Sequence, residues 1–267
     1  MDIAKQIEEL DMQWQALHND IVERCFDGTD SFEWSKISKL PLKVINILQP
    51  MTWRMRDTEE AARVLIDKDY IHPAAILIRS AMENAAFMHM LFITVKDVVE
   101  EKKVLDNTDE ILMNLSFGNQ YKKGEFISDD VFESMQEHKA YRTGKLMKEI
   151  EKLYPTYHSM YSALCEFVHT NTDGVQGCYS ELDEKKHVTY YGKMLTKESA
   201  IFPAIESSIV LALSIFKGYH DAIREMSPEF IVICEGELSP VVAARKRDNE
   251  KNRNFRIFCQ DYQALCL

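Results

Sequence analysis

Residues 72–92, HPAAILIRSAMENAAFMHMLF, form the stretch that decides the fold. A helix over these residues is apolar on nearly every face, which is typical of a helix buried in the middle of a protein. Pro73 suits the first turn, because proline lacks an N–H and the first N–H groups of a helix have no partner within it. We therefore predict a central core helix over about residues 73–96.

The rest of the chain also favours helices. Its 267 residues include only 9 glycines and 7 prolines, and so few turn formers favour long helices over many short strands. We predict two further core helices over residues 155–169 and 197–226, the second closed by Ser227-Pro228. The more polar predicted helices cover residues 3–21, 35 onward with breaks at Pro41 and Pro50, 58–69, 97–115 and 130–153.

One segment interrupts the helical pattern. Residues 175–193 contain Gly177, Gly192 and the run His187-Val-Thr-Tyr-Tyr191, which predict a small β-hairpin or an ordered loop. The expected fold class is all-α, a multi-helix bundle of about eight or nine helices. We expect a helical bundle domain over residues 1–226 and a C-terminal helical tail, residues 227–267, packing on the core.

Charge and cysteine usage restrict the functional class. The formal net charge of −11 argues against a protein that coats nucleic acid, because phosphate binding needs a basic surface. The basic run at residues 244–256 is interpreted as a solvated helix face rather than a nucleic-acid contact. Six cysteines without a CxxC spacing indicate reduced thiols and a cytoplasmic location. Residues 1–11 are too charged for a signal peptide, and no membrane span is expected.

The first predicted helix offers a surface for self-association. Its apolar residues alternate spacings of three and four, as in the seam of a coiled coil. They are Ile3, Ile7, Leu10, Trp14, Leu17 and Ile21. We therefore expect a homo-oligomer, a homodimer in the simplest case, formed through this N-terminal helix.

Four ionisable side chains lie in stretches that are otherwise apolar. Arg79 and Glu83 are four residues apart, Glu166 and His169 three apart, so each pair shares one helix face. Buried charges are costly unless they are paired, so we expect the four to meet. His169 ends its helix, and Asn171 follows among short polar residues that cap and hydrogen-bond. Two interpretations stay open: a structural network that joins two core helices, or a functional site.

Metal chemistry finds little support in the sequence. Glu166-x-x-His169 matches half of a di-iron carboxylate site, and Glu83 and Glu206 could add two carboxylates, but the second histidine is missing. No His-x-x-x-His pair for zinc occurs. We expect no metal and no cofactor.

Two stretches of the chain resemble a known family. AAILIRSAMENAAFMHML (74–91) and YSALCEFVHTN (161–171) resemble a family of bacterial helical proteins known only as a domain of unknown function. The resemblance covers roughly residues 55–220. The matching positions are Arg79, Glu83, Tyr161, Leu164, Val168 and His169. It implies an α-helical bundle and no particular activity.

The arrangement is more distantly similar to the HEPN superfamily. That likeness implies binding or cleavage of RNA in a bacterial defence or stress system, with RNA as partner. HEPN enzymes carry arginine and histidine close together on one helix, and no arginine here precedes a histidine at that spacing. Cleavage would require Arg79 and His169 to meet in space, with His169 as general acid and base and Arg79 stabilising the charged phosphorane. The expected catalytic residues are His169, Arg79 and Glu83, and the expected binding residues are Tyr161, Glu166 and Asn171. The alternative function is a non-catalytic oligomeric scaffold or interaction protein.

Overall fold

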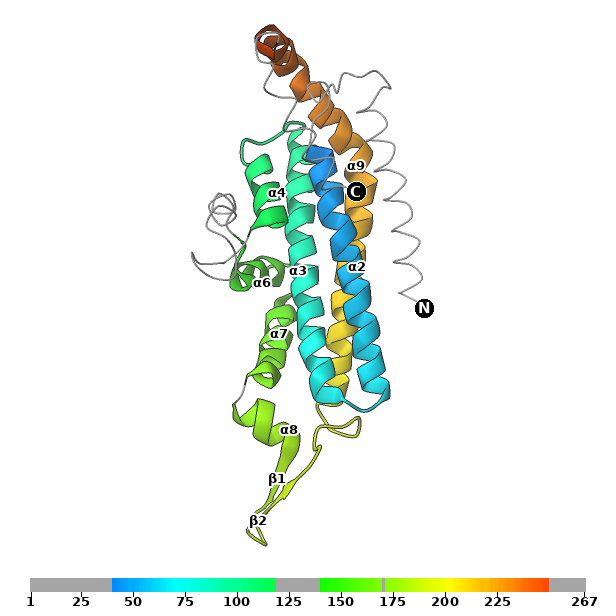
Figure 1. Ribbon diagram of the computed structural model, residues 1–267, viewed down its shortest axis with the longest axis vertical. Coiled ribbons are helices and arrows are strands. Elements are labelled where there is room, and N and C mark those ends of the chain that lie inside the picture. Colours follow the sequence, from blue (N-terminus) through cyan, green and yellow to red (C-terminus); the bar gives the residue numbers. More distant parts are fainter. Residues whose placement is uncertain (1–39, 119–139, 170, 250–267) are drawn as a thin grey trace.

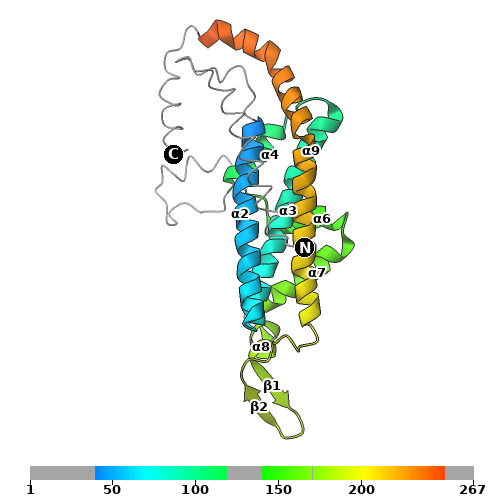
Figure 2. The same cartoon turned by 90° about the vertical axis from the view of Figure 1, so that its right-hand side faces the viewer.

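The computed structural model describes residues 40–118, 140–169 and 171–249. Long helices lie side by side along one axis, and a two-stranded hairpin extends from one end (Figures 1 and 2). The predicted all-α class, with a small hairpin, is confirmed. The predicted N-terminal seam, residues 3–21, and the last eighteen residues of the predicted tail, 250–267, lie outside the described residues.

Three helices form the body of the molecule: α2 (Leu40–Asp67), α3 (Ile71–Glu101) and α9 (Phe202–Asn249). α3 packs against both of the others (Figure 1), as a helix that is apolar on every face should. Its core side chains, such as Ile78 and Met82, are fully buried. The stretch that predicted the fold therefore occupies the centre.

Three shorter helices pack along another side of α3: α4 (Thr108–Phe117), α6 (Thr143–Glu151) and α7 (Pro155–Val168). α7 matches the predicted helix 155–169 closely. The predicted helix 97–115 is wrong in its start, because α3 continues to Glu101 and turns at Lys102, whose φ is 55°.

Two prolines that were predicted to break helices lie inside them. Pro50 is an exposed residue within α2, and the carbonyl of Asn46, left without its usual N–H donor, belongs to another exposed residue. Buried Leu48 and Met55 on either side hold both halves against the same core. Water solvates the free carbonyl, and side chains are buried on both sides of the proline. α2 therefore continues as a single helix.

α9 likewise continues through Ser227-Pro228, so its predicted end at residue 226 is wrong. The Ser227 hydroxyl donates to the carbonyl of Ile223 at 2.7 Å within the helix. Beyond the proline, Phe230 and Cys234 are buried in the core. Apolar burial on both sides of the proline outweighs the single hydrogen bond that it removes.

The hairpin follows α7 through η1 (Thr172–Gln176) and α8 (Gly177–Tyr179) and consists of β1 (Ser180–Asp183) and β2 (Val188–Tyr191). The strands are antiparallel, with Ser180 opposite Tyr191 and Asp183 opposite Val188. The Asp183 carboxylate accepts the N–H groups of Lys185 and Lys186, each at 3.1 Å. Local side-chain bonding thereby fixes the turn.

α3 is the one described helix that is long and apolar enough to cross a membrane by length and composition. More than half, 56%, of an 18-residue apolar window of this helix is buried inside the bundle, and Arg79 and Glu83 lie on the helix. These features fit a helix at the centre of the bundle.

Candidate functional site

A charged cluster joins α3 to α7. Arg79 and Glu83 form an ion pair on α3, with Arg79 Nη2 at 2.8 Å from Glu83 Oε1. The Tyr161 hydroxyl on α7 donates to the same Glu83 oxygen at 2.8 Å and accepts from Arg79 Nη2 at 3.0 Å. The Arg79 guanidinium also lies over the Tyr161 ring, 5.4 Å from its centre. These three residues are called the charged cluster below.

The interactions within the charged cluster shift the pKa values of Arg79 and Tyr161. Burial lowers the pKa of Arg79, but the bonds to Tyr161 and Glu83 outweigh it, and the net pKa lies above its ordinary value. Burial, followed by the hydrogen bond to Glu83, raises the pKa of Tyr161. Arg79 therefore stays a cation and Tyr161 a neutral phenol, the states in which they bind each other and Glu83.

Glu166 and His169 do not join this cluster, so the prediction that four ionisable groups meet is wrong for these two. Both side chains are exposed. The Asn171 amide donates to Glu166 Oε2 at 2.6 Å. The imidazole of His169 makes no hydrogen bond or ion pair within the described part of the chain, and its main-chain N–H donates to the carbonyl of Cys165 at 3.2 Å. Tyr161, at 8% exposure, turns towards the core and the other two turn away.

The end of α7 is fixed by a close main-chain approach. Asn171 Oδ1 accepts the N–H of Gly174 at 2.9 Å. A Cβ on Gly174 would lie 2.0 Å from the carbonyl oxygen of His169, so only glycine fits there. Asn171, predicted as a binding residue, thus stabilises the turn that leads into the hairpin.

His72 makes a contact between helices that the sequence did not predict. Its Nε2 lies 2.7 Å from the carbonyl oxygen of Phe167, and its Nδ1 lies 3.0 Å from the Tyr179 hydroxyl. The imidazole thereby ties the start of α3 to the end of α7 and to α8. The partner carbonyl belongs to the last turn of a helix, where carbonyls lack helical donors, and no sequence pattern identifies it.

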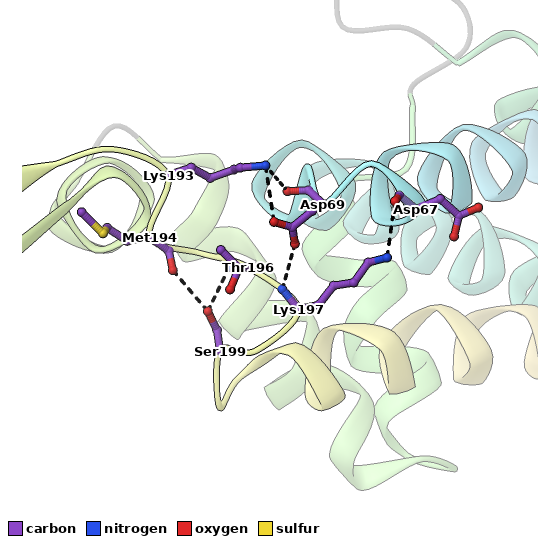
Figure 3. A network of polar contacts seen from close by, with 7 residues as sticks. All are labelled: Asp67, Asp69, Lys193, Met194, Thr196, Lys197 and Ser199. Atoms are coloured by element: carbon purple, nitrogen blue, oxygen red, sulfur yellow. Dashed lines mark hydrogen bonds and ion pairs between the residues drawn. The ribbon is translucent and has the colours of Figure 1, made fainter.

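A second polar network holds the other side of the hairpin base (Figure 3). Asp69, in the turn between α2 and α3, has a φ of 60° and accepts the N–H of Lys197 at 2.9 Å. Lys193 Nζ donates to the Asp69 carbonyl at 2.8 Å and lies 4.7 Å from the centre of the Tyr70 ring. The chain returning from the hairpin is thus fastened to the body.

The described residues contain no group of three or more His, Cys, Asp or Glu side chains that could hold a metal ion. Glu206, considered as a carboxylate ligand, is exposed, as is Glu166. Cys165, Cys178 and Cys234 are free thiols. Cys165, also on α7, lies beside the charged cluster.

No protein family, curated protein or solved structure matches the chain. The resemblance to the HEPN superfamily therefore stays a prediction.

Proposed function

We propose that this chain is a non-catalytic interaction protein whose helical bundle holds a β-hairpin out as a binding element. The observation that carries the proposal is the hairpin itself, which extends beyond the ends of α2 and α3 (Figures 1 and 2). Tyr191 is 84% exposed and Leu182 60% exposed. A hairpin of two strands is marginally stable alone, and this one is fastened at its base by His72 and by Lys193. Fixing an apolar element in solvent lowers the entropy cost of binding a partner.

The charged cluster supports a structural role for the residues that looked most catalytic. Arg79 Nη2, Glu83 Oε1 and the Tyr161 hydroxyl bind one another, while the buried Nε of Arg79 has no hydrogen-bond partner in the described part of the chain. The Tyr161 hydroxyl alone bridges α7 to both charged groups of α3. The network predicted as Arg–Glu–His is therefore Arg–Glu–Tyr, and it serves to hold two helices together.

The HEPN-like function remains the second candidate. The observation that favours it is the group formed by exposed His169, Glu166 and Asn171 at the end of α7, next to the hairpin. Cleavage would still need Arg79, whose hydrogen bonds go to α3 and α7 side chains of the charged cluster. An RNA would have to reach both places at once.

An RNA-cleavage assay on the whole protein, with and without EDTA, separates the two functions. We expect no cleavage by the native chain, by His169→Ala or by Arg79→Ala, and a lower melting temperature for Arg79→Ala alone. His187→Ala, which changes another exposed histidine, is the matched control. EDTA-resistant cleavage that both His169→Ala and Arg79→Ala abolish, while both remain folded, would overturn the proposal.

The cellular location, the pathway and the oligomeric state of the protein are also proposals. A cytoplasmic location agrees with free thiols in the described part and with a bundle whose apolar helix is mostly internal. A place in bacterial defence follows only from the resemblance. Homo-oligomerisation through residues 3–21 follows from the sequence pattern alone.

A further inference from the structure

Two tyrosines of the bundle hold a basic side chain in the same way. In the charged cluster the guanidinium of Arg79 lies over the Tyr161 ring and pairs with the glutamate carboxylate of the cluster. The ammonium of Lys193 lies 4.7 Å from the centre of the Tyr70 ring and pairs with Asp69 at 3.4 Å, an ion pair drawn in Figure 3. A ring attracts a cation through its quadrupole, and a carboxylate attracts it through its charge. A tyrosine beside a carboxylate therefore forms a two-part receptor for a basic side chain.

The hairpin carries a third pair of this kind. Glu181 on β1 stands opposite Tyr190 on β2 in the strand register. Residues opposite each other in an antiparallel pair share one face of the sheet, with Cβ atoms about 4.5–5.5 Å apart. Both line a hollow of about 440 Å³ together with residues 182–185, and Tyr190 is 46% exposed. This side of the hairpin, called the Glu181–Tyr190 face below, thus presents a ring and a carboxylate to solvent together.

The chain supplies no cation to this pair among the residues that the structure describes. The side chains of Glu181 and Tyr190 make no hydrogen bond, ion pair or cation–π contact there. Asp183 on the same face is already neutralised, because Lys186 pairs with it at 2.9 Å and two main-chain N–H groups of the turn donate to it. The ammonium of Lys185, which also lines the hollow, makes no ion pair in this part of the chain. Glu181 and Tyr190 thus repeat the receptor of the two earlier pairs without its basic side chain.

We propose that the Glu181–Tyr190 face binds an arginine side chain of a partner protein. The planar guanidinium stacks on the Tyr190 ring while its N–H groups donate to the Glu181 carboxylate, the arrangement that Arg79 adopts in the charged cluster. The net charge of −11 attracts a basic partner and repels a second copy of this chain. This inference names the chemistry of the partner within the proposed interaction function and rests on that function.

N-acetyl-argininamide is the probe for this contact, because it offers a guanidinium without a charged main chain. Titrated into the full-length, isotopically labelled chain at constant ionic strength, it should shift the amide signals of β1 and β2 more than those of the bundle. The titration extends to about 50 mM, since one exposed cation–π contact with one ion pair binds weakly. N-acetyl-citrullinamide has nearly the same shape without the charge and should leave these signals in place.

Variants of the pair test both parts of the receptor. Tyr190→Leu removes the aromatic face and should raise the dissociation constant of N-acetyl-argininamide about two- to fivefold. Glu181→Gln removes the charge and should raise it by a similar factor. Tyr190→Trp should lower it, because tryptophan attracts a cation most strongly, and a gain in affinity cannot result from an unfolded hairpin. Tyr191→Leu, on the opposite face, and Glu206→Gln, at an exposed position on α9, are the matched controls and should bind as the native chain does.

Three results would overturn the proposal. The first is an equal response to N-acetyl-citrullinamide. The second is a dissociation constant that Tyr190→Leu and Glu181→Gln leave unchanged, or that Tyr191→Leu raises as much. The third is a set of hairpin signals that move with protein concentration in the absence of probe, which would assign this face to a second copy of the chain. Failure of this inference appears in these titrations, whereas failure of the proposed function appears as RNA cleavage.

Discussion

The Tyr161 hydroxyl makes two bonds to charged groups on another helix, which predicts its contribution to stability. Tyr161→Phe removes both bonds and leaves the Arg79–Glu83 pair in place. Hydrogen bonds to charged groups contribute about 1.5–3 kcal/mol each, and partial exposure reduces that contribution. We expect the free energy of unfolding to fall by about 1–2 kcal/mol in urea denaturation.

Tyr191→Phe is the control for this change, because the Tyr191 side chain is 84% exposed. It should leave the free energy of unfolding within about 0.5 kcal/mol of the native value. If both variants unfolded at the same urea concentration as the native chain, the charged cluster would not stabilise the contact between α3 and α7.

Half of the candidate site was predictable from helix periodicity. The spacing of four residues between Arg79 and Glu83 placed both on one face, and the structure joins them. The same geometry should have excluded Glu166, which lies about 140° around the helix from Tyr161 and so away from the core. The apolar face of α7, rather than the charge of a side chain, decides which of its residues meet α3. The contact of His72 depends on tertiary structure and was beyond sequence reasoning.

At the scale of elements, the anchor at Lys193 should control the local stability of the hairpin. Lys193→Met removes the ammonium that binds Asp69 and keeps an apolar stem beside Tyr70. An exposed ion pair of this kind contributes up to about 1 kcal/mol, equivalent to roughly a fivefold change in the population of locally open states. We expect amide hydrogen exchange in β1 and β2 to accelerate by about that factor, with α3 unchanged.

Lys186→Met tests the same charge change at the turn of the hairpin. Lys186 pairs with Asp183 within the turn and makes no bond to the bundle among the described residues. We expect Lys186→Met to change amide hydrogen exchange near the turn only. Equal exchange in native and Lys193→Met hairpins would show that the network of Figure 3 does not fasten the hairpin.

Element type was easier to predict than element length. The hairpin and the core helices were found, since glycine spacing and apolar periodicity are local signals. α2 and α9 were cut short at Pro50 and Pro228 because proline disfavours a helix interior locally. Burial of Met55 and Phe230 beyond these prolines supplies the opposing free energy, and that burial exists only in the assembled bundle.

At the scale of the whole molecule, two buried histidines predict acid sensitivity. His89 on α3 and His220 on α9 are 1% and 0% exposed. Burial lowers the pKa of both, that of His220 from 6.5 to about 4. The unfolded chain binds protons below pH 6.5 and the folded chain does not, so stability present above pH 6.5 is lost as the pH falls towards 4. For His220 the loss is roughly 3 kcal/mol, measurable as urea midpoints across this range.

His220→Gln stays neutral over the whole range and should flatten this pH dependence, although it also lowers stability at pH 7. His187→Gln, at an exposed position, should keep the native slope. A slope that His220→Gln leaves unchanged would assign the acid sensitivity to other groups.

The direction of the strands gives the molecule an unusual rotational signature. An elongated body tumbles slowly about its short axes and faster about its long axis. N–H bonds lie along a helix but across a strand, and the hairpin continues roughly in the direction of the helices (Figures 1 and 2). Nitrogen relaxation of helix amides therefore samples mainly the slow rotation, whereas that of hairpin amides also samples the fast one. The two sets should relax differently even when both are equally rigid, so anisotropy has to be separated from internal motion before the hairpin is described as mobile.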